Sequence, residues 1–391
     1  MRPMRKERTT LKENPTLEAM LEEGFTKRFA EEYLMLQQKE KDSGLFDPDY
    51  LEWAHKNGFL AESACAYGLT DENKDDYLTD YDYWKLWPLN DWQRIWINDK
   101  LTLNAMFMDS ELQKYLPRYF YYTANGRILA LQFTDGTPTV EAMLAKLRQE
   151  GAFACKPCNG TEASGFHMME YRDGQYLLDG QAKTAEEMAA AIAELPNYVF
   201  QEFIVPSPQM AAINSRIHTI RVLAVNQTGS KPELMASYVR FASSGAEESY
   251  KPNYEPPTTP DIFSYNTGID LETGHFGNGK IVYAAKTVDA PEHPATGVLA
   301  EGDLDCWPEV LEMVNKVCAK FSACEYLGFD IGITDKGPRL MEINSHSGIK
   351  YLQVYKPLMA DEKTGPYYRA KLAAIDALDA NAKARRNGIV R

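Results

Sequence analysis

The sequence has no long apolar run and few cysteines. No stretch approaches the roughly 18 consecutive apolar residues that a membrane-spanning helix requires, so no membrane insertion is expected. Six cysteines among 391 residues do not make a disulfide scaffold, which favours a reducing, cytoplasmic location. The first eight residues are charged and no apolar segment follows them, so we expect no secretory signal.

Basic residues are also scarce relative to acidic ones. The chain has 42 Lys and Arg against 56 Asp and Glu, a formal net charge of −14. This balance argues against binding of nucleic acid or of an anionic membrane surface. Cys155 and Cys158 form a lone C-x-x-C, and no second pair completes a zinc site.

The chain is long enough, at 44% apolar composition, to bury two or three cores. Residues 18–41 and 367–386 have apolar residues at helical spacing, and both segments are predicted to be helical. Residues 77–96 are crowded with Tyr and Trp, which favours an anchoring core over a ligand-stacking surface. Residues 247–266 contain four prolines and are predicted to be a loop.

Residues 329–344 are predicted to form a β-hairpin with its turn at 335–338. Asp330 lies in the first strand, and Glu342 and Asn344 lie two residues apart in the second. Because alternate strand residues share a face, the hairpin would bring these three side chains together. Two carboxylates and an amide suit Mg²⁺, which leaves its other positions to water and phosphate oxygens. The alternative is an acidic hairpin edge that faces solvent.

A second segment could hold phosphates. Lys156 lies near the end of a predicted strand and precedes a polar loop over 158–165. The glycine spacing matches a Walker loop, but Phe166 and His167 replace its Lys-Ser/Thr pair, which excludes an ordinary P-loop. Backbone N–H groups of such a hairpin loop can still approach phosphates, with Lys156 as a point charge. The candidate loop residues are Gly160, Thr161, Ser164 and Gly165. An ordinary hairpin remains the alternative.

Residues 198–204 are predicted to be a buried strand. Its last residues offer backbone groups and an apolar wall, which would suit adenine. They are Gln201, Glu202, Phe203 and Ile204.

The order of these segments resembles that of the ATP-grasp enzymes. The resemblance rests on an Asp-Lys pair at Lys100, on Lys156 followed by proline, on Gln201–Ile204 and on Asp330 with Glu342-x-Asn344. It covers roughly residues 80–350. Further stretches are similar to the branch associated with sugar transfer and polysaccharide biosynthesis: 214–222, 239–240, 266–270 and 293–297.

The resemblance implies an α+β, ATP-grasp fold in which two α+β subdomains clamp ATP. The expected regions are a helical, aromatic N-terminal region (1–96), a lysine- and loop-bearing subdomain (97–208), a metal- and substrate-binding subdomain (209–360) and a C-terminal helix (361–391). It also implies that Lys100 and Lys156 contact ATP phosphates, that Glu202 lies beside the adenine and ribose, and that Asp330, Glu342 and Asn344 bind Mg²⁺, with Mn²⁺ as a substitute.

Two features depart from the family pattern. The loop after Lys156 is poorer in glycine than in many members, and His346 follows the last motif without an assigned role. His293 likewise has none. Arg221 and Arg240 are predicted on neighbouring strands, and a guanidinium matches a carboxylate or phosphate in two places. They are therefore the candidates to hold the acceptor carboxylate, the alternative being a structural pair with a nearby acid.

The leading hypothesis is an ATP- and Mg²⁺-dependent carboxylate–amine ligase, acting through an acylphosphate and releasing ADP and phosphate. Its partners would be small molecules, an acid and an amine, among them an amino acid or an amino sugar. A small-molecule kinase and a non-catalytic nucleotide-binding protein are the alternatives.

Overall fold

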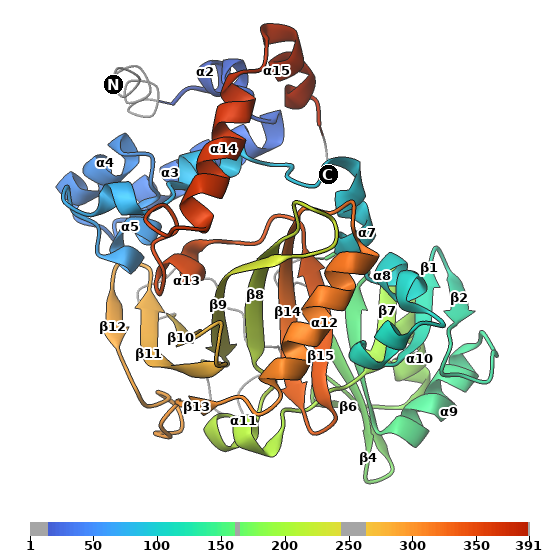
Figure 1. Cartoon of the computed structure of the whole chain (residues 1–391). Helices are drawn as coiled ribbons and strands as arrows, with labels where there is room; N and C mark the ends of the chain where they lie inside the picture. The colour runs from blue at the N-terminus through green and yellow to red at the C-terminus, as the bar shows by residue number, and fades with distance from the viewer. Residues whose placement is uncertain (1–14, 161–164, 244–262, 390–391) are drawn as a thin grey trace.

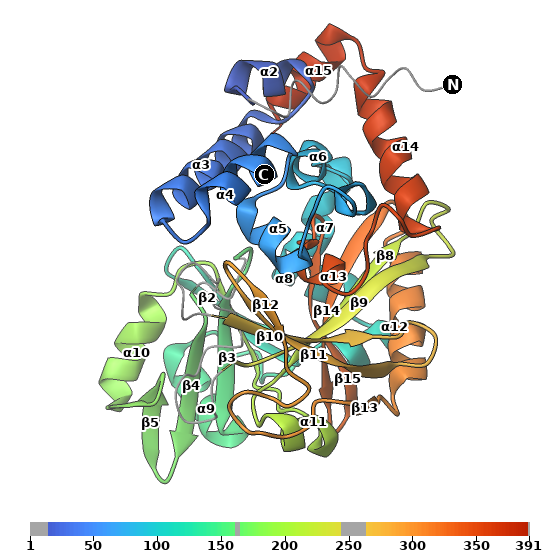
Figure 2. The same ribbon diagram turned by 90° about the vertical axis from the view of Figure 1, so that its left-hand side faces the viewer.

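The computed structural model describes residues 15–160, 165–243 and 263–389. Two antiparallel sheets lie side by side, and a layer of helices built from both ends of the chain covers one end of the larger sheet (Figures 1 and 2). We call this helical layer the cap. The fold is therefore α+β, as predicted.

The first part of the cap precedes the sheets. Its helices are α2 (Leu17–Glu22), α3 (Lys27–Ser43), α4 (Pro48–Lys56), α5 (Ala61–Tyr67), η1 (Lys74–Asp76) and α6 (Asp80–Lys85). Side chains of Thr16, Asp47 and Thr79 accept the N-terminal backbone hydrogen bonds of α2, α4 and α6, which is why these short helices begin there. Four further short elements lead to the sheets: η2 (Asp91–Gln93), α7 (Arg94–Asn98), α8 (Lys100–Phe107) and η3 (Glu111–Tyr115).

The smaller sheet has the strand order β2-β1-β7-β3-β4-β5-β6. Its strands are β1 (Tyr119–Ala124), β2 (Arg127–Ala130), β3 (Ala152–Pro157), β4 (His167–Arg172), β5 (Gln175–Leu178), β6 (Gln181–Lys183) and β7 (Tyr198–Glu202). Helices α9 (Val140–Glu150) and α10 (Ala185–Ala193) pack on one face and share its core. A capping box at Thr184 and Glu187 opens α10.

The larger sheet has the strand order β12-β11-β10-β9-β8-β14-β15, with β13 paired to β11. Its strands are β8 (Thr219–Val225), β9 (Glu233–Phe241), β10 (Phe263–Ile269), β11 (His275–Tyr283), β12 (Thr287–Asp289), β13 (Gly302–Asp303), β14 (Tyr326–Thr334) and β15 (Gly337–Asn344). Helices α11 (Pro208–Ile213) and α12 (Trp307–Lys320) bury their apolar sides with one face of this sheet (Figure 1).

The cap covers part of the opposite face. Leu223 and Tyr326 of the sheet share a core with cap residues such as Tyr83 and Tyr368. The C-terminal contribution consists of α13 (Lys350–Gln353), α14 (Thr364–Asp376) and α15 (Ala380–Asn387). Arg386 donates a 2.9 Å hydrogen bond to the carbonyl oxygen of Gly24, so the two ends of the chain close the cap together.

Three predictions of local structure need correction. Residues 361–391 do not form one helix, because Asp379 caps a new helix, α15, after α14 has ended. In the aromatic segment, Tyr81, Tyr83 and Trp87 are buried, but Trp92 is 70% exposed. Residues 263–266 belong to strand β10, while residues 244–262 lie outside the described part of the chain.

Within the described residues, every helix is too short or too polar to cross a membrane. The six cysteines are free thiols. Cys155 packs in the core of the smaller sheet, whereas Cys158 packs in the core shared with the larger sheet and donates to Asp99. The C-x-x-C is thus divided between two cores.

Candidate active site

The hairpin of β14 and β15 carries the predicted metal-binding side chains. Asp330 lies directly opposite Glu342, and Gly328 lies opposite Asn344. The Asn344 amide donates a 3.1 Å hydrogen bond from Nδ2 to Oδ2 of Asp330. The structure therefore brings the three predicted side chains to one face of the sheet.

A β-bulge in β15 places these residues on that face. Leu340 pairs with Ile331 while Glu342 pairs with Asp330, so Met341 is the extra residue between two regular pairs. Leu340 and Ile343 are both buried in the core on the α12 side, which strict alternation would not permit. The bulge lets one strand direct apolar residues to the core and Glu342 and Asn344 to the site.

Arg221 of β8 binds the neighbouring carboxylate. It pairs with Asp330 across the strands, and its guanidinium donates from Nε to Oδ1 at 2.5 Å and from Nη2 to Oδ2 at 3.1 Å. A third donor, Nη1, bonds to the hydroxyl of Ser347. Burial alone would lower the pKa of Arg221, but the charge of Asp330 outweighs it and the pKa is raised. In this structure Arg221 therefore holds Asp330 rather than a substrate.

Two lysines face the carboxylates from the side of the smaller sheet. Lys100 is the first residue of α8, and its Nζ lies 3.8 Å from Oε2 of Glu342 and 3.1 Å from the carbonyl oxygen of Gly160. Lys156 lies on β3, next to the start of the 158–165 loop. The backbone N–H of Lys100 donates to the carbonyl of Cys158 at 2.9 Å, which fixes α8 against that loop.

Burial and charged neighbours shift the pKa values of Lys156 and Glu342. Burial and the nearby charge of Lys100 lower the pKa of Lys156 to about 8, although Glu342 and Asp330 act in the opposite direction. Burial raises the pKa of Glu342, an effect that Asp330 strengthens and Lys100 and Lys156 weaken. Two cations and two carboxylates thus share the site. A polyphosphate would offset the repulsion between the two lysines, and a divalent cation would offset the repulsion between the two carboxylates.

The loop after Lys156 is fixed at both ends. Gly165 has φ of +73°, and a Cβ there would lie 2.6 Å from the Tyr198 hydroxyl oxygen and 2.9 Å from Cγ of Pro157. Only glycine fits this close approach, which returns the chain to β4 beside its point of departure. Gly160 is described, while the predicted residues Thr161 and Ser164 lie outside the described residues.

The segment predicted to hold adenine ends β7 and leads to the larger sheet. Gln201 is 1% exposed, and its Nε2 has no hydrogen-bond partner among the residues that the structure describes. Gln201 pairs with Ala154, so it shares a face with Lys156 two residues along β3. Beyond β7, Phe203 and Ile204 are half-buried, and Ile204 lies over Gly332 of β14.

Glu202 bonds to protein groups. Arg118 donates to its carboxylate from Nη2 at 3.3 Å and from the backbone N–H at 3.2 Å. Lys336, in the turn between β14 and β15, donates to the same carboxylate at 3.3 Å. Burial would raise the pKa of Glu202, but the hydrogen bonds from Arg118 outweigh burial and lower it. The carboxylate joins the two sheets at this edge.

Arg240 lies on the same face of the larger sheet as Arg221. Tyr238 pairs with Arg221, and Arg240 is two residues further along β9, opposite Thr219 and Asn266. Its Nη2 donates to the Tyr238 hydroxyl at 3.2 Å, and its guanidinium carbon lies 4.6 Å from the ring centre of Tyr351. These contacts leave its carboxylate-binding role as a prediction.

His293 and His346, which had no assigned role, both contact neighbouring protein groups. His293 is buried and donates from Nε2 to the carbonyl of Ala242 at 2.7 Å. His346 stacks on Tyr83, with ring centres 4.1 Å apart.

Sequence reasoning missed several residues that position the site. Ser347 bonds to Arg221, Asn98 bonds to the residue after Asn344, and Arg118 holds Glu202. One signal was present for Ser347. Gly328 is a glycine inside a buried strand, which indicates close approach of another segment, and a Cβ at Gly328 would overlap with Ser347.

The arrangement fits Mg·ATP. Oxygen donors of Asp330, Glu342 and Asn344 suit Mg²⁺, and the buried Nε2 of Gln201 needs an acceptor such as an adenine nitrogen. Across the described ranges, no cluster of three or more His, Cys, Asp or Glu side chains is arranged around a metal position. Two carboxylates agree with Mg²⁺, which takes one or two from protein and completes its shell with phosphate and water.

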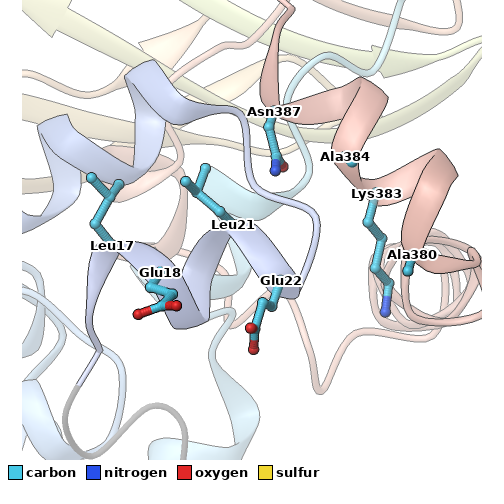
Figure 3. Close-up of a pocket in the computed structure, with 8 residues that line it drawn as sticks. All are labelled: Leu17, Glu18, Leu21, Glu22, Ala380, Lys383, Ala384 and Asn387. Carbon is cyan, nitrogen blue, oxygen red and sulfur yellow. The ribbon is translucent and has the colours of Figure 1, made fainter.

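The grooves on the cap are separate from this site. One lies between α2 and α15, and Leu17 and Leu21 face Ala384 and Asn387 across it (Figure 3). None of its lining residues is a predicted site residue.

The family described as sugar-transfer associated ATP-grasp matches residues 92–362. The chain belongs to this family. The match includes the lysines, the loop and the carboxylate hairpin, and it ends before α14. Tyr83 and Tyr368 therefore lie outside the family's matched region, although they pack against the site's sheet. Curated proteins gave no significant match to this chain.

Solved structures of ATP-grasp ligases are distantly similar. The ligase PsnB with its minimal precursor has 14% identity and a TM-score of 0.36, over 73% of this chain and 63% of that one. D-alanyl-alanine synthetase A from Vibrio cholerae has 13% identity and a TM-score of 0.42, over 72% of this chain and 66% of that one. L-amino acid ligase from Bacillus licheniformis has 10% identity and a TM-score of 0.35, over 67% of this chain and 43% of that one. The chain thus spans less than two thirds of the length of each of these proteins.

Proposed function

We propose that the protein is an ATP- and Mg²⁺-dependent ligase that joins a carboxylic acid to an amine. The observation that carries the proposal is the opposition of Lys100 and Lys156 to Asp330 and Glu342 across the two sheets. Phosphoryl transfer needs little covalent help from protein, but it needs phosphate charge neutralised and the reactants aligned. Membership of the ATP-grasp family supports this use of the site.

Each residue has a proposed role. Lys100 and Lys156 bind ATP phosphates, with backbone N–H groups of the 158–165 loop, and the Gln201 amide binds the adenine. Asp330, Glu342 and Asn344 hold Mg²⁺, which supplies charge neutralisation when bound. Arg221 orients Asp330. Arg240 holds the acceptor carboxylate, because its guanidinium lies over the Tyr351 ring on the same face of the sheet as Arg221, and a guanidinium matches a carboxylate in two places.

The proposed reaction has two steps. The acceptor carboxylate attacks the γ-phosphorus, which forms an acylphosphate and releases ADP. The amine then attacks the carbonyl carbon, loses a proton and displaces phosphate. The net change is acid, amine and ATP to amide, ADP and phosphate. Amino acids and amino sugars are the proposed substrates, in a family named for its association with sugar transfer.

ADP release tests the proposal. Purified protein with Mg·ATP should release ADP over many turnovers only when both a carboxylate and an amine are present, and a screen of amino acids and sugar acids should find them. Hydroxylamine should trap the intermediate as a hydroxamate. A phosphate ester instead would indicate a kinase, and no substrate-dependent ADP from any mixture would exclude the ligase.

The variant Glu342→Gln should lower the rate of ADP release by about 100-fold or more, since a metal site contributes several kcal/mol to transition-state stabilisation. Glu272→Gln, an exposed substitution at the turn before β11, is the control and should retain full activity. Equal activity of Glu342→Gln and the wild type would contradict the metal role.

A further inference from the structure

The segment after the last metal-binding residue crosses back over the larger sheet. Residues 345–348 follow Asn344 and place Ser347 directly over Gly328, where any Cβ would overlap with the serine side chain. Ser347 is 1% exposed. Gly328 and Asp330 lie on one face of β14, so Ser347 sits beside the carboxylate that the proposed function assigns to the metal.

Ser347 completes the contacts of Arg221. Two of the guanidinium nitrogens bind Asp330, and the third nitrogen binds the Ser347 hydroxyl. A guanidinium held by a single carboxylate can swing together with it, whereas one that is also held at its third corner cannot. Asp330 therefore has its position fixed from the Arg221 side, and Asn344 fixes its Oδ2 from β15.

The cap in turn holds Ser347. The Tyr83 hydroxyl donates to the carbonyl oxygen of Ser347 and lies 3.3 Å from the hydroxyl of Tyr326. The Tyr326 hydroxyl lies 3.0 Å from that of Tyr368 on α14. The three tyrosines are at most 4% exposed, so their hydrogen bonds do not compete with bulk water. A buried chain of contacts thus runs from α14 and α6 to Ser347, Arg221 and Asp330.

The neighbouring serine has a different partner. Ser345 is also buried, but its N–H and hydroxyl bond to Asn98 of α7, at 3.0 and 2.9 Å. Ser345 and Ser347 therefore anchor the same four-residue segment through side chains of the same size. Of these two serines, Ser347 is the one that bonds to Arg221.

We propose that Ser347, held by Tyr83 of the cap, is a positioning residue that acts through Arg221 to fix Asp330 for divalent-cation binding. The proposal rests on the proposed function, because it assumes that Asp330 is a metal ligand. It gives the cap, whose Tyr83 and Tyr368 lie outside the family's matched region, a part in setting the cation affinity of the site. Groups behind the metal ligands commonly change metal affinity by 10- to 100-fold.

Binding of Mn²⁺ in the presence of ADP tests the proposal without catalysis. Free Mn²⁺ is measured by electron paramagnetic resonance in titrations of the full chain. Ser347→Ala should raise the Kd for Mn²⁺ by about tenfold or more. Its affinity for ADP alone, in the presence of a chelator, should stay within about twofold of wild type, since no metal is involved.

Two further variants separate positioning from general stability. Ser345→Ala removes a hydroxyl from the same segment and should lower the melting temperature while leaving the Kd for Mn²⁺ within about twofold. Tyr83→Phe keeps the ring stacked on His346 and removes only the hydroxyl, so it should raise the Kd for Mn²⁺ by a smaller factor than Ser347→Ala.

The outcomes distinguish this inference from the proposed function. Wild-type affinity for Mn²⁺ in Ser347→Ala, or an equal loss in Ser345→Ala, would overturn the positioning role alone. A wild-type protein that binds ADP but no Mn²⁺ would overturn the metal site, and the positioning role with it.

Discussion

The charge of Lys156 in the candidate site depends on its surroundings and changes near pH 8. Burial and Lys100 lower its pKa to about 8, so a growing fraction of the protein has a neutral lysine as the pH rises past that value. Phosphates placed beside it would favour the charged form and raise the pKa again. ATP binding and protonation of Lys156 are therefore coupled.

This coupling predicts proton uptake on ATP binding. At pH 8.5 the complex should take up about half a proton or more, and ATP affinity should fall as the pH rises above 8. Isothermal titration calorimetry in two buffers of different ionisation enthalpy measures the uptake. Lys156→Arg should abolish it, because arginine stays charged. Lys316→Arg, on the surface of α12, should retain it. Uptake that persists in Lys156→Arg would contradict the assignment.

At the scale of elements, the loop between β3 and β4 depends on Gly165. Its left-handed backbone costs a non-glycine residue about 1 kcal/mol, and its Cβ would in addition collide with Tyr198 and Pro157. Gly174 in the β4–β5 turn has φ of +80° but open space around its Cβ position. An alanine at either position would have a strained backbone, but only at position 165 would its Cβ also collide with other side chains.

Gly165→Ala should therefore weaken ATP binding by about tenfold, the equivalent of one hydrogen bond to a charged phosphate. Gly174→Ala should lose similar backbone stability and bind ATP as the wild type does. Equilibrium binding of a fluorescent ATP analogue, with urea midpoints for stability, measures both. A loss of affinity in both variants would show that strain alone is responsible.

The elements also show what sequence can and cannot predict. The β14–β15 hairpin was predictable, because Asp335–Pro338 is turn chemistry and the flanking strands carry the carboxylates. The bulge at Met341 was not, because Leu340 and Met341 are both apolar and nothing local says which faces the core. The helical pattern over 367–386 hides the break at Asp379, since the residues around it are good helix formers.

Long-range pairs limit the prediction of the site. The hairpin pattern predicted Asp330, Glu342 and Asn344, the polar loop predicted Lys156, and the family resemblance added Lys100. The structure brings these residues together. The pairing of Arg221 with Asp330 depends on strands β8 and β14 being neighbours, although the two residues are 109 positions apart in sequence. Tyr83 is even more distant from Ser347, and no local pattern marks a tyrosine hydroxyl as part of a site.

At the scale of the whole molecule, a buried lysine joins the N-terminal and C-terminal parts of the cap. Lys85 is 4% exposed and bonds to Glu23 and Asp376, each at 2.8 Å. It thereby joins the N-terminal helices to α14. Removing the cation leaves two carboxylates close together and partly buried, so the loss of stability should exceed that of an exposed ion pair.

Lys85→Met should lower the free energy of unfolding by about 2 kcal/mol. The control is Lys74→Met, which breaks an exposed pair with Asp71 and should cost less than about 1 kcal/mol. Urea denaturation followed by circular dichroism measures both. A smaller loss for Lys85→Met than for Lys74→Met would contradict this role.

Asp80 makes the stability of the cap depend on pH. Burial raises its pKa to about 7, although hydrogen bonds from the Leu60 N–H and the Ser63 hydroxyl act in the opposite direction, while Glu40 raises and Lys350 lowers it. The folded protein therefore keeps a proton that the unfolded chain releases above about pH 4. The resulting stabilisation is complete below the unfolded pKa and is lost as the pH rises towards 7.

Between pH 5.5 and pH 8, wild type should lose about 2 kcal/mol of stability that Asp80→Asn does not lose, because asparagine has no proton to release. Urea midpoints at the two pH values measure the difference. Parallel pH profiles for the two proteins would contradict the raised pKa.

The cap is closed by residues from both ends of the chain, as the hydrogen bonds of Arg386 to Gly24 and of Lys85 to Asp376 show. Figure 1 shows α14 and α15 beside the N-terminal helices. This has a consequence for synthesis. Because a ribosome makes the N-terminus first, helices α2 to α6 emerge long before α14 and α15 exist to cover them. The apolar residues of α5 that share a core with Tyr368 and Leu372 therefore stay exposed until α14 is made. The site's hairpin is likewise made before the tyrosine of α14 that completes its support, so a chain stopped short of α14 would carry every predicted site residue without the finished cap.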